Sequence, residues 1–138
     1  MNDEPQNPTP ETEAEDAALI ELANSLLDAA RQGDAATLLA YLDQGAPVNL
    51  LDSAGNSPLM LAAYHGHAAL VTELAARGAD VDLLNDRGQS PLAGAAFKGD
   101  VEVAKALLAA GADPELGTPS ARETAAYFQR AEITALLG

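Results

Sequence analysis

The feature that most constrains this 138-residue chain is a pattern of glycine, proline, leucine and alanine that repeats between positions i and i+33. The pattern is clearest in residues 52–84, which read DSAGNSPLMLAAYHGHAALVTELAARGADVDLL, and it recurs in residues 85–117. The matching positions are Gly55 and Gly88, Pro58 and Pro91, Leu59 and Leu92, Ala63 and Ala96, Gly66 and Gly99, Leu74 and Leu107, Gly78 and Gly111, and Ala79 and Ala112. A fixed period of this length predicts a stacked array of small units, not one closed globule.

Each unit has the signals of two short helices. Ser57 can cap a helix whose first residue is Pro58, because the fixed φ of proline suits the first helical position. Gly66 ends this helix, and residues 68–76 form the second one. Gly78 then supplies a left-handed residue, where a β-carbon would cost about 1–2 kcal/mol. The pattern therefore predicts an all-α repeat solenoid with an extended excursion after each helical pair.

Weaker copies of the pattern lie at both ends of the array. Residues 17–51 contain a helical pair without the Gly-x-Ser-Pro-Leu opening, which predicts an N-terminal capping unit whose first helix ends at Gly33 and whose second is capped by Asp34. The Thr-Glu-Ala-Glu run at 12–15 has the form of a capping box, so the first helix should begin between residues 12 and 17. Residues 118–138 match at an offset of 30, which predicts a truncated C-terminal cap lacking about three residues between its helices.

Residues 1–16 differ from the rest of the chain in composition. They contain six acids, no base and three prolines. Such a segment cannot bury enough apolar surface to offset the entropy of ordering, so we expect a disordered, solubilising tail, with a partner-binding arm as the alternative. The formal net charge of −14 argues against nucleic-acid and anionic-membrane partners, since both are bound through excess Lys and Arg.

The sequence offers little for catalysis or metal binding. There is no Cys, and no nucleophile elbow or phosphate-binding glycine loop occurs. His65 and His67 have no evident third ligand, so His67 is better explained by a structural role than by a metal. Asp80 and Asp82 are better explained as turn acceptors than as a calcium pair. We therefore expect no enzymatic activity and no cofactor. Without a secretory signal or an apolar run long enough to span a membrane, we expect a soluble cytoplasmic protein.

The repeated motifs Gly-x-Ser-Pro-Leu, Ala-Ala, Gly-His and Leu-x-x-x-Gly-Ala-Asp resemble those of ankyrin repeats. The resemblance extends over residues 17–138 and implies helix-turn-helix units with hairpin loops: two full repeats, 52–84 and 85–117, between partial capping repeats at 17–51 and 118–138. Two departures stand out. Met60 and Ala93 occupy the place of the usual histidine, and Gly94 replaces a leucine. Because glycine costs roughly 1 kcal/mol of helix propensity, we expect residues 91–98 to form the least protected helix.

The resemblance implies a non-catalytic protein-binding module that uses the hairpin tips and the exposed ends of the first helices, which together line a concave face. The corresponding positions are Arg31, Gln32, Ser53, Ala54, Asn56, Tyr64, His65, Asp86, Arg87, Gln89, Phe97 and Lys98. We expect a monomer that binds another protein there.

Two alternatives remain open on sequence grounds. Tyr64 and Phe97 occupy equivalent positions of successive units, so stacking should set them side by side, either as binding anchors or as rings that only pack on each other and on the neighbouring hairpin. The protein could also be an acidic inhibitor or mimic that occupies the site of a basic partner. The salt dependence of partner binding should distinguish electrostatic capture from aromatic-anchored binding, since electrostatic capture weakens steeply with ionic strength and aromatic-anchored binding changes little.

Overall fold

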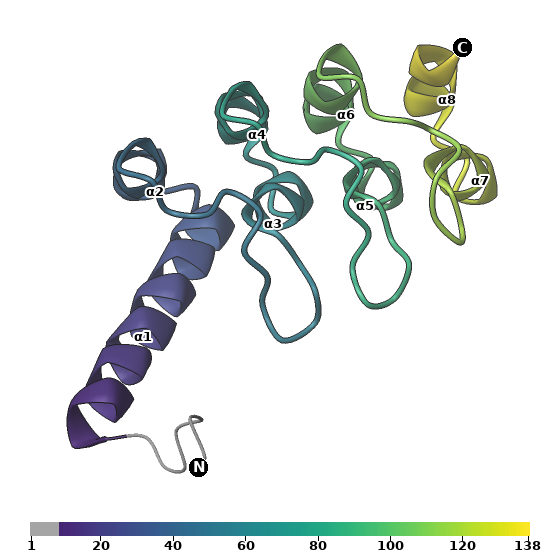
Figure 1. Cartoon of the computed structure of the whole chain (residues 1–138). Coiled ribbons are helices and arrows are strands. Elements are labelled where there is room, and N and C mark those ends of the chain that lie inside the picture. The colour runs from purple at the N-terminus through teal and green to yellow at the C-terminus, as the bar shows by residue number, and fades with distance from the viewer. Residues whose placement is uncertain (1–8) are drawn as a thin grey trace.

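The structure is a computed structural model that describes residues 9–138. Its helices follow one another in four pairs: α1 (Pro10–Gln32) with α2 (Ala35–Asp43), α3 (Pro58–Tyr64) with α4 (Ala68–Ala76), α5 (Pro91–Lys98) with α6 (Val101–Ala109), and α7 (Ala121–Tyr127) with α8 (Ala131–Leu137). Helices α1, α3, α5 and α7 form one layer and α2, α4, α6 and α8 the other, with loops projecting beyond the first layer (Figure 1). The predicted all-α repeat solenoid is confirmed.

The first helix begins earlier than the sequence analysis predicted. Its N-cap is Thr9, whose hydroxyl accepts a hydrogen bond from the backbone N–H of Thr12, and Pro10 occupies the first helical turn. The capping box predicted at residues 12–15 is therefore wrong, because the Thr-Pro pair supplies a start signal one turn upstream. Residues 10–16 of the expected disordered tail are helical and exposed, whereas residues 1–8 lie outside the described part.

Buried serines begin the first-layer helices of the last three units. Ser57, Ser90 and Ser120 each accept a hydrogen bond from the backbone N–H three residues later. All three are at most 5% exposed, so each hydroxyl pairs an N–H that could not reach water. Ser90 follows Ser57 by the full repeat period, whereas Ser120 follows Ser90 at an offset of only 30.

The spacing of these serines corrects the prediction about the last unit. The offset of 30 is already present at Ser120, where α7 begins, so the missing residues belong to the preceding loop and not to the link between α7 and α8. The last loop in Figure 1 is accordingly shorter than the two before it. A cap built from Ser120 and Glu123 replaces the Ser-Pro start of the earlier units.

The core lies between the two helix layers and is continuous along the array. Leu59 and Leu92 are fully buried at equivalent positions of α3 and α5, and Leu74 and Leu107 are fully buried on α4 and α6. Buried alanines surround them and permit close approach of the helices. Each unit buries apolar side chains between its own two helices and completes that burial by stacking on its neighbours.

The residue at the head of a second-layer helix also ties neighbouring units together. His67, just before α4, donates from Nε2 to the carbonyl oxygen of Arg31 at 2.8 Å. Arg130, just before α8, donates to the carbonyl oxygen of Phe97 at 2.8 Å. Asp100 occupies the corresponding place before α6, and its carboxylate instead caps its own helix at Val103. The structural role predicted for His67 is confirmed.

Candidate protein-binding face

A groove of about 470 Å³ runs across the surface formed by the loops and the first-layer helices, which we call the inner face. We refer to this groove, between α3, α5 and their loops, as the central groove. Eight of the twelve positions expected to contact a partner line it: Arg31, Ala54, Asn56, Tyr64, His65, Arg87, Gln89 and Phe97. The structure thus brings together residues from three successive units in one concavity.

The other four expected contact residues, Gln32, Ser53, Asp86 and Lys98, do not line the central groove. All four are exposed. Gln32 is the last residue of α1, and Ser53 lies in the first loop. Asp86 lies in the second loop, where its backbone N–H donates to Ala54. Lys98 borders a neighbouring hollow that shares Tyr64 and His65 with the central groove.

The loop that forms one wall of the groove is organised by Asp52. One carboxylate oxygen accepts the backbone N–H groups of Ala54 and Asn56 at 2.9 Å, and the other accepts the Asn56 amide and the Arg31 guanidinium. Burial acts to raise the pKa of Asp52, but the hydrogen bonds from Asn56, Ala54 and Arg31 outweigh it and lower the pKa below its ordinary value. Asp52 is therefore a charged hub that holds the loop shape.

The second loop repeats this arrangement with an amide in place of the carboxylate. The side-chain oxygen of Asn85 accepts the backbone N–H groups of Arg87 and Gln89, each at 3.0 Å. Its side-chain nitrogen donates to Asn56 of the preceding loop at 2.9 Å. The two loops are consequently fixed relative to each other, and the positions that line the groove are preorganised.

Tyr64 and His65 form the edge of the central groove at the end of α3. Their rings meet edge to face with centroids 5.6 Å apart, and Lys98 Nζ lies 4.6 Å from the centre of the Tyr64 ring. Burial lowers the pKa of His65, and the nearby His67, Lys98 and Arg31 lower it further.

Tyr64 and Phe97 both line the central groove, but each forms its aromatic contacts elsewhere. Phe97 meets Phe128 of the last unit at 5.2 Å and 89°, and Phe128 in turn meets Tyr127 at 4.9 Å. Within residues 9–138 no ring contact joins Tyr64 to Phe97, so the interpretation that these two rings pack on each other is wrong. Lys98 lies over the Tyr64 ring instead, and Phe128 meets Phe97 edge to face.

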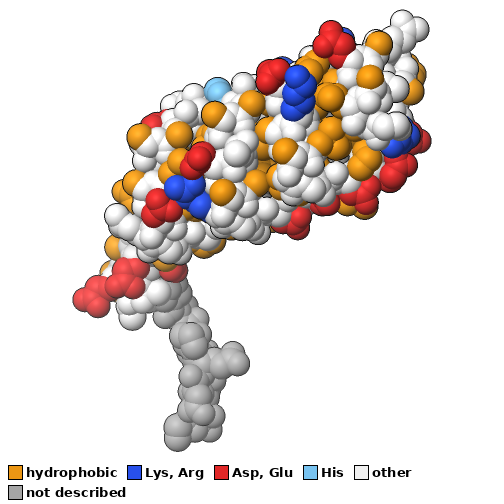
Figure 2. All heavy atoms as spheres, turned by 90° about the horizontal axis from the view of Figure 1, so that it is seen from above, with side chains coloured by type: hydrophobic (Ala, Val, Ile, Leu, Met, Phe, Trp, Pro, Cys, Tyr) orange, Lys and Arg blue, Asp and Glu red, His pale blue; other side chains and the backbone are white. Residues whose placement is uncertain are grey.

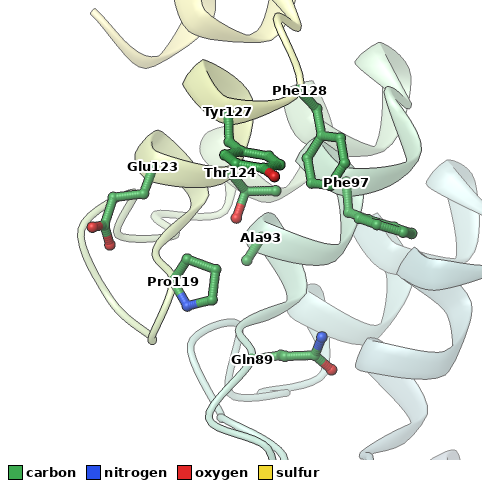
Figure 3. Close-up of a pocket in the computed structure, with 8 residues that line it drawn as sticks. All are labelled: Gln89, Ala93, Phe97, Pro119, Glu123, Thr124, Tyr127 and Phe128. Carbon is green, nitrogen blue, oxygen red and sulfur yellow. The ribbon is translucent and has the colours of Figure 1, made fainter.

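A second concavity, which was not predicted from the sequence, lies between α5 and α7, and we call it the C-terminal groove. It measures about 430 Å³ and is lined by Gln89, Ala93, Phe97, Pro119, Glu123, Thr124, Tyr127 and Phe128 (Figure 3). A signal for it was present in the sequence, because the offset of 30 found in the last unit carries Phe97 onto Tyr127.

Two basic residues of the inner face, Arg87 and Lys98, differ in their pairing from Arg77 and Lys105 of the second layer. Arg77 of the second layer pairs with Asp43 and Glu73, and Lys105 pairs with Glu102. Figure 2 shows Lys and Arg side chains beside acidic ones on the surface seen from above. Among the described residues, Arg87 and Lys98 form no ion pair, whereas Arg31 of the same face pairs with Asp28 and Asp52.

The acidic candidates for metal binding have structural roles. Asp80 accepts the backbone N–H of Asp82, and Asp82 accepts the backbone N–H of Asp113 in the next unit. The prediction of a turn acceptor is confirmed for Asp80, whereas Asp82 accepts from the next unit and ties the two loops together. In the described part of the chain, no three His, Cys, Asp or Glu side chains converge as a set of metal ligands. None of the helices over residues 9–138 has both the length and the apolar character needed to cross a membrane.

Comparison with known proteins agrees with the geometry. The family described as "Ankyrin repeats (3 copies)" matches residues 26–118, which is more than half of the chain. No curated protein matches the chain significantly. Ankyrin repeats are generally protein-protein interaction modules, and the paired helices, projecting loops and fixed repeat period described above agree with the family match. The chain belongs to the ankyrin-repeat family.

Proposed function

We propose that this protein is a non-catalytic adaptor or modulator that binds another protein through its inner face, with the central groove as the contact surface. The observation that carries the proposal is the convergence of eight expected contact positions from three units on this groove. Tyr64 lines this groove and is partly exposed, and the groove is also lined by Arg87, a cation with no ion pair in the described part of the chain. Aromatic and arginine side chains dominate the binding energy of many interfaces.

The protein acts as a monomer in this proposal. A net charge of −14 on each copy opposes self-association, because two copies repel each other at ordinary ionic strength. Sedimentation velocity at two concentrations checks this point, with a single species near the mass of one chain as the expected result.

A matched pair of tyrosines tests the binding surface. Tyr64 on α3 and Tyr41 on α2 are 39% and 41% exposed, but only Tyr64 lies on the inner face. We expect Tyr64→Ala and Arg87→Ala to reduce capture of the partner from the native cell, measured by quantitative mass spectrometry, and Tyr41→Ala to leave it unchanged. Urea unfolding of each variant separates lost binding from lost stability.

Two outcomes would contradict the proposal. Equal loss of partner with Tyr41→Ala and Tyr64→Ala would show that the second layer or the general fold matters, not the groove. Unchanged capture with both Tyr64→Ala and Arg87→Ala would remove the central groove from the interface.

A second candidate function, an acidic inhibitor that occupies the site of a basic partner, is favoured by α1. Over residues 9–30 this stretch contains six acids and no base. Leu19 and Ile20 on the same helix are 65% and 61% exposed, and α1 projects away from the array (Figure 1). If this helix is the contact, capture should fall steeply between low and moderate salt and should be abolished by charge-neutralising substitutions in α1, while Tyr64→Ala has no effect.

A further inference from the structure

A column of aromatic side chains lies along the inner face, with one ring from each of the last three units. Tyr64, Phe97 and Tyr127 lie at equivalent positions, at the ends of α3, α5 and α7. The next unit supplies a side chain that contacts each of the first two rings. Lys98 Nζ lies 4.6 Å from the Tyr64 ring centre, and the Phe128 ring lies 5.2 Å from that of Phe97.

Tyr127 is the most exposed ring of this column. In residues 9–138 no side chain takes the place over Tyr127 that Lys98 takes over Tyr64, and Tyr127 is 81% exposed. Its ring contact is with the adjacent Phe128, at 4.9 Å and 75°. Tyr127, Phe128 and Phe97 together form a contiguous cluster of exposed rings, and exposed apolar clusters of this kind mark interaction sites.

The C-terminal groove opens beside Tyr127. In Figure 3 the rings of Tyr127, Phe128 and Phe97 border one side of the groove, Pro119 and Glu123 the other, and Ala93 lies between them. Its volume of about 430 Å³ suits an amino-acid side chain with part of its backbone. The shortened loop before α7 bounds the groove only through Pro119.

Glu123 gives the groove a charge. It precedes Tyr127 by four residues on α7, so both side chains lie on one face of the helix. One carboxylate oxygen accepts the backbone N–H of Ser120, and within the described residues the other forms no hydrogen bond. A cation that entered the groove would therefore meet an available carboxylate beside an exposed aromatic ring.

We propose that the C-terminal groove binds an arginine side chain presented by the partner protein, with the guanidinium between the Tyr127 ring and the Glu123 carboxylate. The Lys98–Tyr64 contact shows that this fold already places a cation on the equivalent ring of another unit. The net charge of −14 attracts a basic segment, and arginine stacks on aromatic rings and pairs with carboxylates better than lysine does. The proposal rests on the proposed function, because it names one chemical feature of the same partner.

The test uses the full chain and three small probes. Backbone amide shifts of ¹⁵N-labelled protein are titrated with the Nα-acetyl methylamides of arginine, of citrulline, its neutral isostere, and of phenylalanine. We expect arginine to shift the amides of Ala93, Glu123 and Tyr127 with saturation, and citrulline to bind about three- to fivefold more weakly, the range that a cation–π contact contributes at an exposed site.

Substitutions on exposed side chains sharpen the test. Tyr127→Ala and Glu123→Gln should each weaken arginine binding about threefold or more, whereas Tyr127→Phe, which keeps the ring face, should stay within about twofold. Glu123→Gln preserves the cap of α7, because glutamine can accept the same N–H. Tyr41→Ala, on α2 of the second layer and outside the groove, serves as the control and should leave the affinity of this groove unchanged.

Three results would overturn the proposal. Citrulline could bind as tightly as arginine, phenylalanine could bind more tightly than arginine, or arginine could shift amides of α4 and α6 as strongly as those of the groove. The first two would make the groove an apolar pocket, and the third would indicate general charge attraction. None of these results would affect the proposed function, because that function is tested separately, by the capture of the partner protein with the Tyr64→Ala and Arg87→Ala variants.

Discussion

Replacing Gly94 by alanine should stabilise the protein, although the glycine is buried in the middle of α5. A β-carbon added there would lie 3.6 Å from Cδ2 of Tyr64 and 4.0 Å from the sulfur of Met60, which are ordinary van der Waals distances. Because Gly94 has helical backbone geometry, alanine adopts its conformation without strain. The site therefore has room for the methyl group and a backbone suited to it.

The magnitude follows from two contributions. Alanine is better than glycine in a helix interior by about 0.8–1.0 kcal/mol. Partial burial of one methyl group against Tyr64 and Met60 adds a few tenths of a kcal/mol, out of about 0.8 kcal/mol for full burial. We expect an increase of about 1–1.5 kcal/mol in the free energy of unfolding, and a rise of about 3–6 °C in Tm for a domain of this size.

Urea unfolding followed by far-ultraviolet circular dichroism measures this free energy directly. Amide hydrogen exchange measures the protection of each helix separately. We expect residues 91–98 of the unmodified protein to exchange faster than residues 101–109, and Gly94→Ala to slow the exchange of α5 specifically. The prediction that α5 is the least protected helix is thereby tested in the same experiment.

Gly78→Ala is the matched control, because it makes the same chemical change with the opposite expected sign. Gly78 has φ +90° with nothing within 4 Å of an added β-carbon. The expected decrease in the free energy of unfolding, about 1–2 kcal/mol, therefore reflects backbone strain alone. If Gly94→Ala also destabilised the protein, the added methyl would have to displace Tyr64, and the reasoning from contact distances would be refuted.

Three further substitutions have defined outcomes. His67→Ala should destabilise by about 1–2 kcal/mol in urea unfolding, because it leaves the Arg31 carbonyl without its 2.8 Å hydrogen bond, whereas exposed His65→Ala should change little. Gln129→Gly should increase the free energy of unfolding by about 0.5–1 kcal/mol and so raise Tm, because Gln129 has φ +57° and glycine adopts this conformation without strain. An unchanged Tm would argue against strain at this position. Asp52→Asn should destabilise by about 1.5–3 kcal/mol at pH 7. Since folding lowers the Asp52 pKa, its stabilisation is present above the pKa of the unfolded state and is lost as the pH falls through that of the folded state; a difference from Asp52→Asn that stays constant throughout an acid titration would contradict this assignment.

Local signals in the sequence were sufficient for the helices of the central units. Ser57 and Pro58 predicted the start of α3, and Gly78 the end of α4, because capping and left-handed geometry depend on one residue and its immediate neighbours. The predicted start of α1 was wrong because two start signals lie close together in the sequence. The Thr9–Pro10 pair determines the start, whereas the threonine at residue 12 was expected to cap the helix.

The fixed repeat period itself determined the architecture, since a unit that cannot bury its own apolar face must stack on a copy of itself. Which side chain covers which ring was decided by the tertiary structure alone. Spacing places Tyr64 and Phe97 in one column, but only the packed array shows Lys98 and Phe128 contacting them and Tyr127 as the most exposed ring. Such contacts depend on rotamers and on the shortened last loop, and neither is encoded in the periodicity of a single unit.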